Sequence, residues 1–195
     1  MRNYILGGAS RSGKSSTAIT LCEQIGINWY PLDPIICAIQ ETLPETGITY
    51  QRRSDAEIAQ RLSPFFWELV KKIQGSSKRT FYRALGIRKG FVIDTCFVLP
   101  SEAKAFESRD LVIAFFGYPG LSAEQKLEQI RQNETMDDWT NKQDDGTLLH
   151  SLRQWILDSR YYQEQCKELG LLFFDTSESF DQVLEYAVDT MVNMP

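Results

Sequence analysis

Gly8-Ala9-Ser10-Arg11-Ser12-Gly13-Lys14-Ser15 is the stretch of this 195-residue chain that decides its fold. It matches the pattern G-x-x-x-x-G-K-[ST] at every fixed position. The apolar run Tyr4-Ile5-Leu6 precedes it, and a helix-like stretch from Ser16 to Ile25 follows. A strand that passes through a glycine-rich loop into a helix is the setting in which this pattern holds phosphates. The alternative, a Gly/Ser-rich turn between unrelated elements, does not account for this setting.

The residue types of this loop suit the chemistry of a triphosphate. Glycines allow the sharp turns that point backbone N–H groups inward around an anion. The positive end of the helix dipole that begins near Ser16 favours the same negative charge. Lys14 adds a compact cation for the β- and γ-phosphates, and the Ser15 hydroxyl is a ligand for Mg²⁺. Residues 8–16 are therefore predicted to bind a nucleoside triphosphate with Mg²⁺.

Length and composition indicate one globular domain over residues 1–195, with room for a small lid. The apolar fraction is 43%, the charged fraction is 24%, and the net charge is −5. This negative balance disfavours a nucleic-acid partner and favours a small substrate. No apolar run is long enough to cross a bilayer, and the N-terminus is not a signal peptide. The four cysteines lie far apart, so we expect reduced thiols and a cytoplasmic protein.

Five apolar segments alternate with helical patterns along the chain. The predicted strands are residues 3–7, 27–32, 91–93, 111–116 and 171–174. Such alternation predicts a parallel sheet with helices on both faces, because each crossover between parallel strands needs a helix. The expected fold is an α/β three-layer P-loop NTPase fold with strand order 2-3-1-4-5 and a helical lid.

Two further segments complete the expected domain. Residues 34–78 are predicted to form a substrate-side helical segment, which contains the capping box Ser54-Asp55-Ala56-Glu57. Pro64 interrupts its helical spacing, so Ser63 and Pro64 are expected to begin a second helix. Residues 131–153 are expected to form the lid, with a polar, mobile loop from Asn133 to Gly146.

Two aspartates follow predicted strands and are therefore expected at the crevice beyond their carboxyl ends. Asp94 follows Phe91-Val92-Ile93, where a carboxylate holds Mg²⁺ or its water shell. Asp33 follows the second strand, where it would accept a hydrogen bond from a substrate hydroxyl as a general base does. Both are expected on strands that flank the first strand. The alternatives are a capping or loop role for Asp94 and an Asp-Pro turn at Asp33.

Arginines near the polar loop are candidates for contacts with a transferring phosphoryl group. Arg131 and Arg153 flank the loop, while Arg153, Arg160 and Lys167 recur every seven residues and stay on one helix face. A cationic face beside a closing lid stabilises phosphoryl oxygens. A solvated helix face is the alternative interpretation.

Four other features of the sequence are interpreted as chance matches or as parts of the protein surface. Asn141-Lys142-Gln143-Asp144 matches the guanine-reading N-K-x-D of GTPases, but it lies in the polar loop and does not end a strand. Asp94-Thr95-Cys96-Phe97 lacks the glycine of the GTPase D-x-x-G. His150, the one histidine, is expected at the surface, and the basic stretch 78–89 is interpreted as a solvated or substrate-side surface.

On these residues the chain resembles the P-loop kinases of small molecules and nucleotides, the group that contains adenylate, shikimate and gluconate kinases. Within this group it is most similar to chloramphenicol phosphotransferase-like proteins, in which an aspartate after the second strand acts as base. Ala9 and Arg11 differ from the loop of those proteins. Asp175-Thr176-Ser177 looks like their adenine-side loop, which implies that Thr176 contacts the nucleotide.

The resemblance implies phosphoryl transfer from ATP, with Mg²⁺, to a small-molecule hydroxyl or a nucleotide. Lys14, Asp33, Arg131 and Arg153 are then the catalytic candidates, and Ser15 and Asp94 the metal-binding candidates. The alternative function is an ATP-binding regulatory switch with slow hydrolysis and no small-molecule acceptor. The sequence leaves the acceptor open.

Overall fold

The structure is a computed structural model that describes residues 2–48, 55–77 and 90–194. The basic stretch 78–89 and Ser54 of the predicted capping box lie outside these residues. The strands are β1 (Asn3–Gly8), β2 (Asn28–Pro31), β3 (Phe91–Asp94), β4 (Leu111–Gly117) and β5 (Leu172–Asp175). The helices are α1 (Lys14–Ile25), α2 (Leu32–Thr42), α3 (Asp55–Ser77), α5 (Pro100–Phe106), α6 (Ala123–Asn133), α7 (Asp145–Leu169) and α8 (Phe180–Asn193), with short 3-10 helices η1 (Pro44–Thr46) and η2 (Trp139–Lys142).

The five strands form one parallel sheet in the order β2-β3-β1-β4-β5, as predicted. The strand that leads into the phosphate loop is central, because β1 pairs with β3 on one side and with β4 on the other. In this register Ile5 lies opposite Ile93 and Ile113. The carboxyl ends of all five strands therefore meet at one edge of the sheet.

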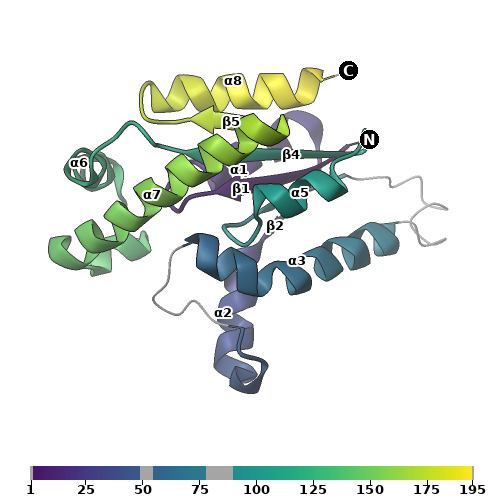
Figure 1. Ribbon diagram of the computed structural model, residues 1–195, viewed down its shortest axis with the longest axis horizontal. Helices are drawn as coiled ribbons and strands as arrows, with labels where there is room; N and C mark the ends of the chain where they lie inside the picture. Colours follow the sequence, from purple (N-terminus) through teal and green to yellow (C-terminus); the bar gives the residue numbers. More distant parts are fainter. Residues whose placement is uncertain (1, 49–54, 78–89, 195) are drawn as a thin grey trace.

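Alternate side chains of the central strand pack into two different cores, as the two-residue period of a strand requires. Tyr4 and Leu6 belong to the core that α1 and α8 complete. Ile5, between them, belongs to the core that α3, α5 and α7 complete. Figure 1 shows the resulting three layers, with α8 above the sheet and α3 below it. Helices cover both faces of the sheet, and the expected P-loop NTPase fold is confirmed.

The helix α3 corrects one prediction. It runs without interruption from Asp55 to Ser77 with Pro64 in its interior, so Pro64 does not begin a second helix. Ser63 was expected to cap that second helix, but its buried hydroxyl donates to a carboxylate oxygen of Glu102 on α5. Packing of α3 on the sheet and on α5 therefore outweighs the hydrogen bond that a proline removes from a helix.

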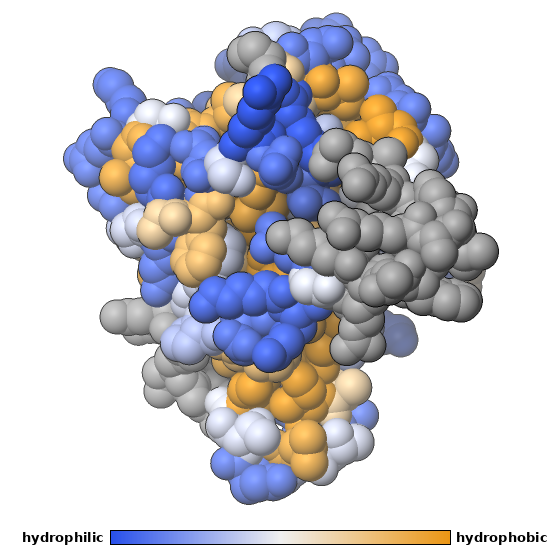
Figure 2. All heavy atoms as spheres, turned by 90° about the vertical axis from the view of Figure 1, so that its right-hand side faces the viewer, coloured by the Kyte–Doolittle hydropathy of each residue, from blue (hydrophilic) through white to orange (hydrophobic). Residues whose placement is uncertain are grey.

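The helix α2 projects from the body of the molecule, at the lower end of Figure 1. It buries only Leu32 and Ile36, while Ile35 is 36% exposed. Figure 2 shows the apolar surface at this lower end. None of the helices within the described ranges has an apolar stretch long enough to cross a bilayer.

Candidate functional site

The phosphate loop joins β1 to α1 and depends on two glycines. Gly8 has φ +115° and Gly13 has φ +95°, backbone angles that residues with a side chain rarely adopt. A Cβ atom on Gly8 would lie 2.0 Å from the carbonyl oxygen of Phe116, so β4 leaves no space for a side chain there. A Cβ atom on Gly13 would lie 2.7 Å from Cδ2 of Leu184 on α8. The loop is thus packed tightly between the sheet and α8.

Hydrogen bonds hold the loop in shape. The Lys14 ammonium donates to the carbonyl oxygens of Gly8 at 3.0 Å and Ala9 at 2.5 Å. The hydroxyl of Ser12 donates to Ala9 O at 2.7 Å, and that of Tyr118 donates to Ser10 O at 2.8 Å. Gly13 is the N-cap residue of α1, and no side chain caps this helix end. The N-terminal N–H groups of α1 and the Lys14 cation therefore lie together at the start of one helix, an arrangement suited to an anion.

Ser15 and Asp94 lie side by side at the carboxyl edge of the sheet. The Ser15 hydroxyl donates to Oδ2 of Asp94 at 2.5 Å, and the indole Nε1 of Trp29 donates to Oδ1 at 2.7 Å. Asp94 is 7% exposed. Because β3 pairs directly with β1, its final residue falls next to the start of α1. A hydroxyl and a carboxylate at this spacing can serve one Mg²⁺ together with phosphate and water oxygens.

Within the described residues, no group of three or more His, Cys, Asp or Glu side chains is arranged to hold a metal ion. A Mg²⁺ ion that takes one or two protein ligands and several phosphate or water oxygens needs no such group. The donor set of Ser15 and Asp94 therefore fits Mg²⁺ brought in with a nucleotide, and does not fit a resident metal.

Asp33 differs from its predicted position. The strand β2 ends at Pro31, and Asp33 lies in the first turn of α2. Pro34 follows it in the same turn, where the missing N–H of a proline costs little, so the dipeptide is not a loop turn. The strand β2 pairs with β3 and not with β1, so Asp33 is one strand further from the loop than expected.

One large cavity nevertheless connects these groups. Its volume is about 2040 Å³, and it is lined by residues of the phosphate loop, the strand ends, the lid and α8. Of the predicted site residues it includes Ser10, Arg11, Ser12, Gly13, Lys14, Ser15, Ser16, Asp33, Asp94 and Arg153. The cavity therefore reaches from the loop to the two aspartates. Cys37, one turn after Asp33 on α2, lines it as well, but burial, followed by the negative charge of Asp33, raises the pKa of this thiol. A protonated thiol is a weak nucleophile.

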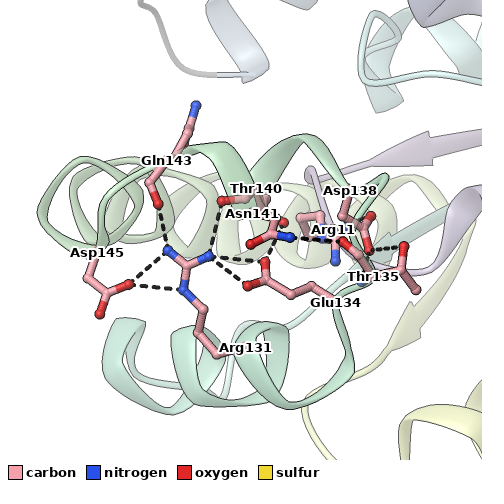
Figure 3. A network of polar contacts seen from close by, with 9 residues as sticks. All are labelled: Arg11, Arg131, Glu134, Thr135, Asp138, Thr140, Asn141, Gln143 and Asp145. Carbon is pink, nitrogen blue, oxygen red and sulfur yellow. Dashed lines mark hydrogen bonds and ion pairs between the residues drawn. The ribbon is translucent and has the colours of Figure 1, made fainter.

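Arg131 forms hydrogen bonds with the polar segment that follows α6. Figure 3 shows its guanidinium at the centre of the lid, facing residues 134–145. It donates to carboxylate oxygens of Glu134 and Asp145 at 2.8 Å and to carbonyl oxygens of Thr140 at 3.0 Å and Gln143 at 2.7 Å. Arg131 is absent from the lining of the described cavity. In this geometry Arg131 binds the polar segment at several points, and its contact with a phosphate stays a prediction.

The lid contacts the phosphate loop through one ion pair. Arg11 has φ +60°, unusual for a residue other than glycine, and its guanidinium lies 2.7 Å from Oδ1 of Asp138. The backbone N–H of Thr135, followed by the charge and hydrogen bond of Arg11, holds the pKa of Asp138 below its usual value. The polar segment, expected to be a mobile loop, is thus folded by Arg131 and fastened to the loop by Arg11.

The other two candidate arginines, Arg153 and Arg160, lie on α7. Arg153 lines the cavity, is 64% exposed in its side chain, and has Glu124 as an ion-pair partner at 3.4 Å. The Arg160 Nε donates to the carbonyl oxygen of Pro119 at 3.1 Å. An exposed arginine with a long ion pair can turn toward a bound anion, since such a pair contributes little stability.

Thr176 lies away from the cavity. It is 1% exposed, and its hydroxyl donates to the carbonyl oxygen of Gly117 at 3.1 Å. Its side chain therefore joins the end of β5 to β4, and the contact of Thr176 with a nucleotide stays a prediction. Residues 175–177 resemble an adenine-side loop by their position in the chain. The Thr176 hydroxyl forms a hydrogen bond within the protein.

Two residues next to the predicted site residues, Trp29 and Lys126, were not singled out from the sequence. Trp29 holds Asp94, as described above. Lys126 lines the cavity from α6 although it is 3% exposed. Its sequence position contains the signal, because Ala123, Lys126 and Ile130 are the buried positions of α6 and share one helix face. A lysine in the buried stripe of a helix is unusual, because an isolated charge is costly to remove from water.

Comparison with known proteins supports the same architecture. No protein-family model matches the chain, and no curated protein matches its sequence. Among solved structures, a shikimate kinase from Bacteroides thetaiotaomicron superposes with a TM-score of 0.54 at 10% identity, over 98% of each chain. The chain has a P-loop small-molecule kinase-like fold. A gluconokinase from Sinorhizobium meliloti 1021 gives 0.53 at 16% identity, over 98% of this chain and 91% of its own. An uncharacterized protein from Eubacterium ventriosum ATCC 27560 gives 0.53 at 13% identity, over both full lengths.

Proposed function

We propose that this chain is an ATP-dependent phosphotransferase that acts on a small-molecule hydroxyl or a nucleotide. The observation that carries the proposal is the common cavity of the phosphate loop, the Ser15–Asp94 pair and the carboxylate of Asp33. A phosphoryl transferase needs these three parts in one space: a cradle for the donor phosphates, a place for the metal ion, and a group that orients the acceptor. The kinase-like fold supports the same interpretation.

The donor side is assigned to residues 8–16. The loop presents the N–H groups at the start of α1 to the phosphate chain, and Lys14 exchanges its carbonyl partners for phosphate oxygens. Ser15 and Asp94 hold the Mg²⁺ ion directly or through water. When bound, Mg²⁺ neutralises the charge that develops on the phosphate oxygens. ATP is preferred to GTP in this proposal because the N-K-x-D match lies in the lid and Asp144 caps α7 through the Thr147 N–H.

The acceptor side is assigned to Asp33. Its carboxylate accepts a hydrogen bond from the acceptor hydroxyl and directs that oxygen at the γ-phosphorus. As the new P–O bond forms, the bond from the γ-phosphorus to the β–γ bridging oxygen breaks, ADP leaves, and Asp33 takes up the hydroxyl proton. Arg153 is the lid cation that turns toward the transferring phosphoryl group. Arg131 shapes the lid that carries it, and so acts by positioning. In this proposal the substrate-side helices α2 and α3 and the lid at 131–153 lie on either side of the acceptor site of one domain.

An acceptor screen tests this proposal. The purified protein is incubated with Mg²⁺ and ATP labelled with radioactive phosphorus in the γ position, alone and with sugar acids, cyclic polyols, aminoglycoside-type alcohols and nucleoside monophosphates, gluconate and shikimate included. The expected result is a labelled organic product that depends on one acceptor class and disappears in Lys14→Ala. Slow release of labelled inorganic phosphate with no labelled acceptor would contradict transfer and favour the regulatory switch.

A further inference from the structure

Lys126 is a buried cation with no anionic partner in the part of the chain that the structure describes. Its ammonium lies 4.4 Å from the ring centroid of Tyr118 and 5.4 Å from that of Phe180. None of the ion pairs among the described residues involves Lys126, and its ammonium has no hydrogen bond to a carboxylate there. The residue is 3% exposed and yet lines the cavity. The two ring faces attract the ammonium but do not neutralise its charge.

A buried ammonium without a negatively charged partner destabilises the protein when no ligand is bound. Burial, with a further contribution from the positive charge of Arg11, lowers the pKa of Lys126 to about 8. The side chain is therefore still mostly protonated at pH 7. Two cations, Arg11 and Lys126, thus influence one region of the cavity, and only Arg11 has an ion-pair partner, Asp138. An unpaired buried charge destabilises a fold unless a ligand supplies the opposite charge.

The aromatic residues around Lys126 are attached to the phosphate loop. The Tyr118 hydroxyl donates to Ser10 O at 2.8 Å. A Cβ atom built on Gly13 would lie 3.0 Å from Cζ of Phe180. The ammonium is therefore held next to the loop on the side of Arg11, α6 and α8. Ser15, Asp94 and Asp33 belong to the side formed by β3 and α2.

We propose that Lys126 is a second phosphate-binding cation of the nucleotide site, which contacts the phosphate chain of the donor from the lid side of the loop. This inference rests on the proposed function. Lys14 and Lys126 reach the chain from different elements, α1 and α6, so the bound phosphates connect the lid to the loop. The rings of Tyr118 and Phe180 hold the Lys126 ammonium in place before the nucleotide arrives, which lowers the entropy cost of binding.

Calorimetric titration of the full chain with Mg²⁺-ATP and with Mg²⁺-tripolyphosphate, which has neither base nor ribose, tests this role. Lys126→Met keeps the apolar stem and removes the charge. We expect it to weaken both ligands by the same factor, about 10- to 100-fold for the loss of a charge-assisted hydrogen bond. Lys126→Arg keeps the charge and should retain most of the affinity. Lys104→Met, which removes an exposed lysine of α5 that does not line the cavity, is the matched control and should bind as the wild type does.

Thermal unfolding of the unliganded variants separates binding from a structural role. A lysine kept for a ligand predicts that Lys126→Met unfolds at the same or a higher temperature than the wild type, since an uncompensated charge is removed. A lower unfolding temperature together with wild-type affinity for tripolyphosphate would overturn the inference. If the wild type and Lys126→Met bind the nucleotide with the same high affinity, the role of Lys126 is refuted, but the proposed function is not. Absence of nucleotide binding by the wild type would refute the proposed function as well.

Discussion

Substitution of Gly13 by alanine tests whether the phosphate loop is as tightly packed as described. Two costs apply at this position. The backbone has φ +95°, and the new Cβ would lie 2.7 Å and 3.2 Å from Cδ2 and Cδ1 of Leu184. Gly26 at the other end of α1 provides the matched control, because it has φ +67° and no atom within 4 Å of a built Cβ. The two variants share the conformational cost and differ in the packing cost.

The magnitudes follow from these contacts. A left-handed conformation costs an alanine about 1–2 kcal/mol, which is the whole effect expected for Gly26→Ala. Overpacking adds about 1–3 kcal/mol at Gly13, so Gly13→Ala should lower the free energy of unfolding by about 2–5 kcal/mol. For a chain of this size, 1 kcal/mol corresponds to about 2–4 °C in unfolding temperature. Gly13→Ala should therefore unfold clearly below Gly26→Ala.

Urea denaturation measures the two free energies, and the shift in unfolding temperature on addition of Mg²⁺-ATP measures nucleotide binding. At a ligand concentration about 100 times its dissociation constant, the wild type should gain about 2.7 kcal/mol. Gly26→Ala should keep this gain, whereas Gly13→Ala should lose most of it, because the added methyl displaces the start of α1. Equal destabilisation of the two variants, or an undiminished ATP shift in Gly13→Ala, would refute the packing described for the loop.

Three other substitutions separate the roles of the carboxylates. Asp33→Asn should reduce turnover by about 10²- to 10⁴-fold with nearly unchanged ATP affinity, measured by transfer assay and calorimetry, and full activity would refute a general-base role. Asp94→Asn should weaken Mg²⁺-dependent ATP binding and turnover together, whereas Asp110→Asn at the surface should change neither, and equal binding by both variants would contradict the metal assignment. Asp138 has a lowered pKa in the fold, so its contribution to stability is present above its usual pKa of 3.8 and is lost as the pH falls through the folded value. The stability advantage of the wild type over Asp138→Asn, measured by thermal unfolding from pH 7 to pH 2.5, should therefore disappear in acid, and a difference that is constant with pH would count against the Arg11–Asp138 contact.

The sequence was sufficient to predict the architecture because the signals were local and mutually consistent. Each of the five strands is a short apolar run, and the phosphate loop marks β1 as the strand from which the crossovers proceed. The strand order was predicted from the rule that crossovers between parallel strands are right-handed. Boundaries were less accurate where tertiary contacts decide them. The helix α2 begins directly after β2 because Leu32 and Ile36 are both buried, and α3 continues through Pro64 because its apolar face is packed along its length.

The site was predicted less completely, because side-chain partners depend on contacts between distant segments. Arg131 and Thr176 are polar residues in plausible positions, yet their polar atoms bond to backbone carbonyls of neighbouring segments. No periodicity shows which carbonyls a guanidinium or hydroxyl will meet. Trp29 reaches Asp94 across the strand pair β2–β3, a contact that only the register brings about. Lys126 was not predicted either, although its spacing from Ala123 and Ile130 places it on the buried face of α6.

The most direct test of the central claim is the fate of the γ-phosphate. In a single-turnover experiment with enzyme in excess over labelled ATP, and with the acceptor that the screen identifies, the label is followed in the organic product and in inorganic phosphate. A phosphotransferase places most of the label in the product, and Asp33→Asn slows this step while Lys14→Ala abolishes it. Label that appears only as inorganic phosphate, at the same rate in the wild type and in Asp33→Asn, would contradict the account.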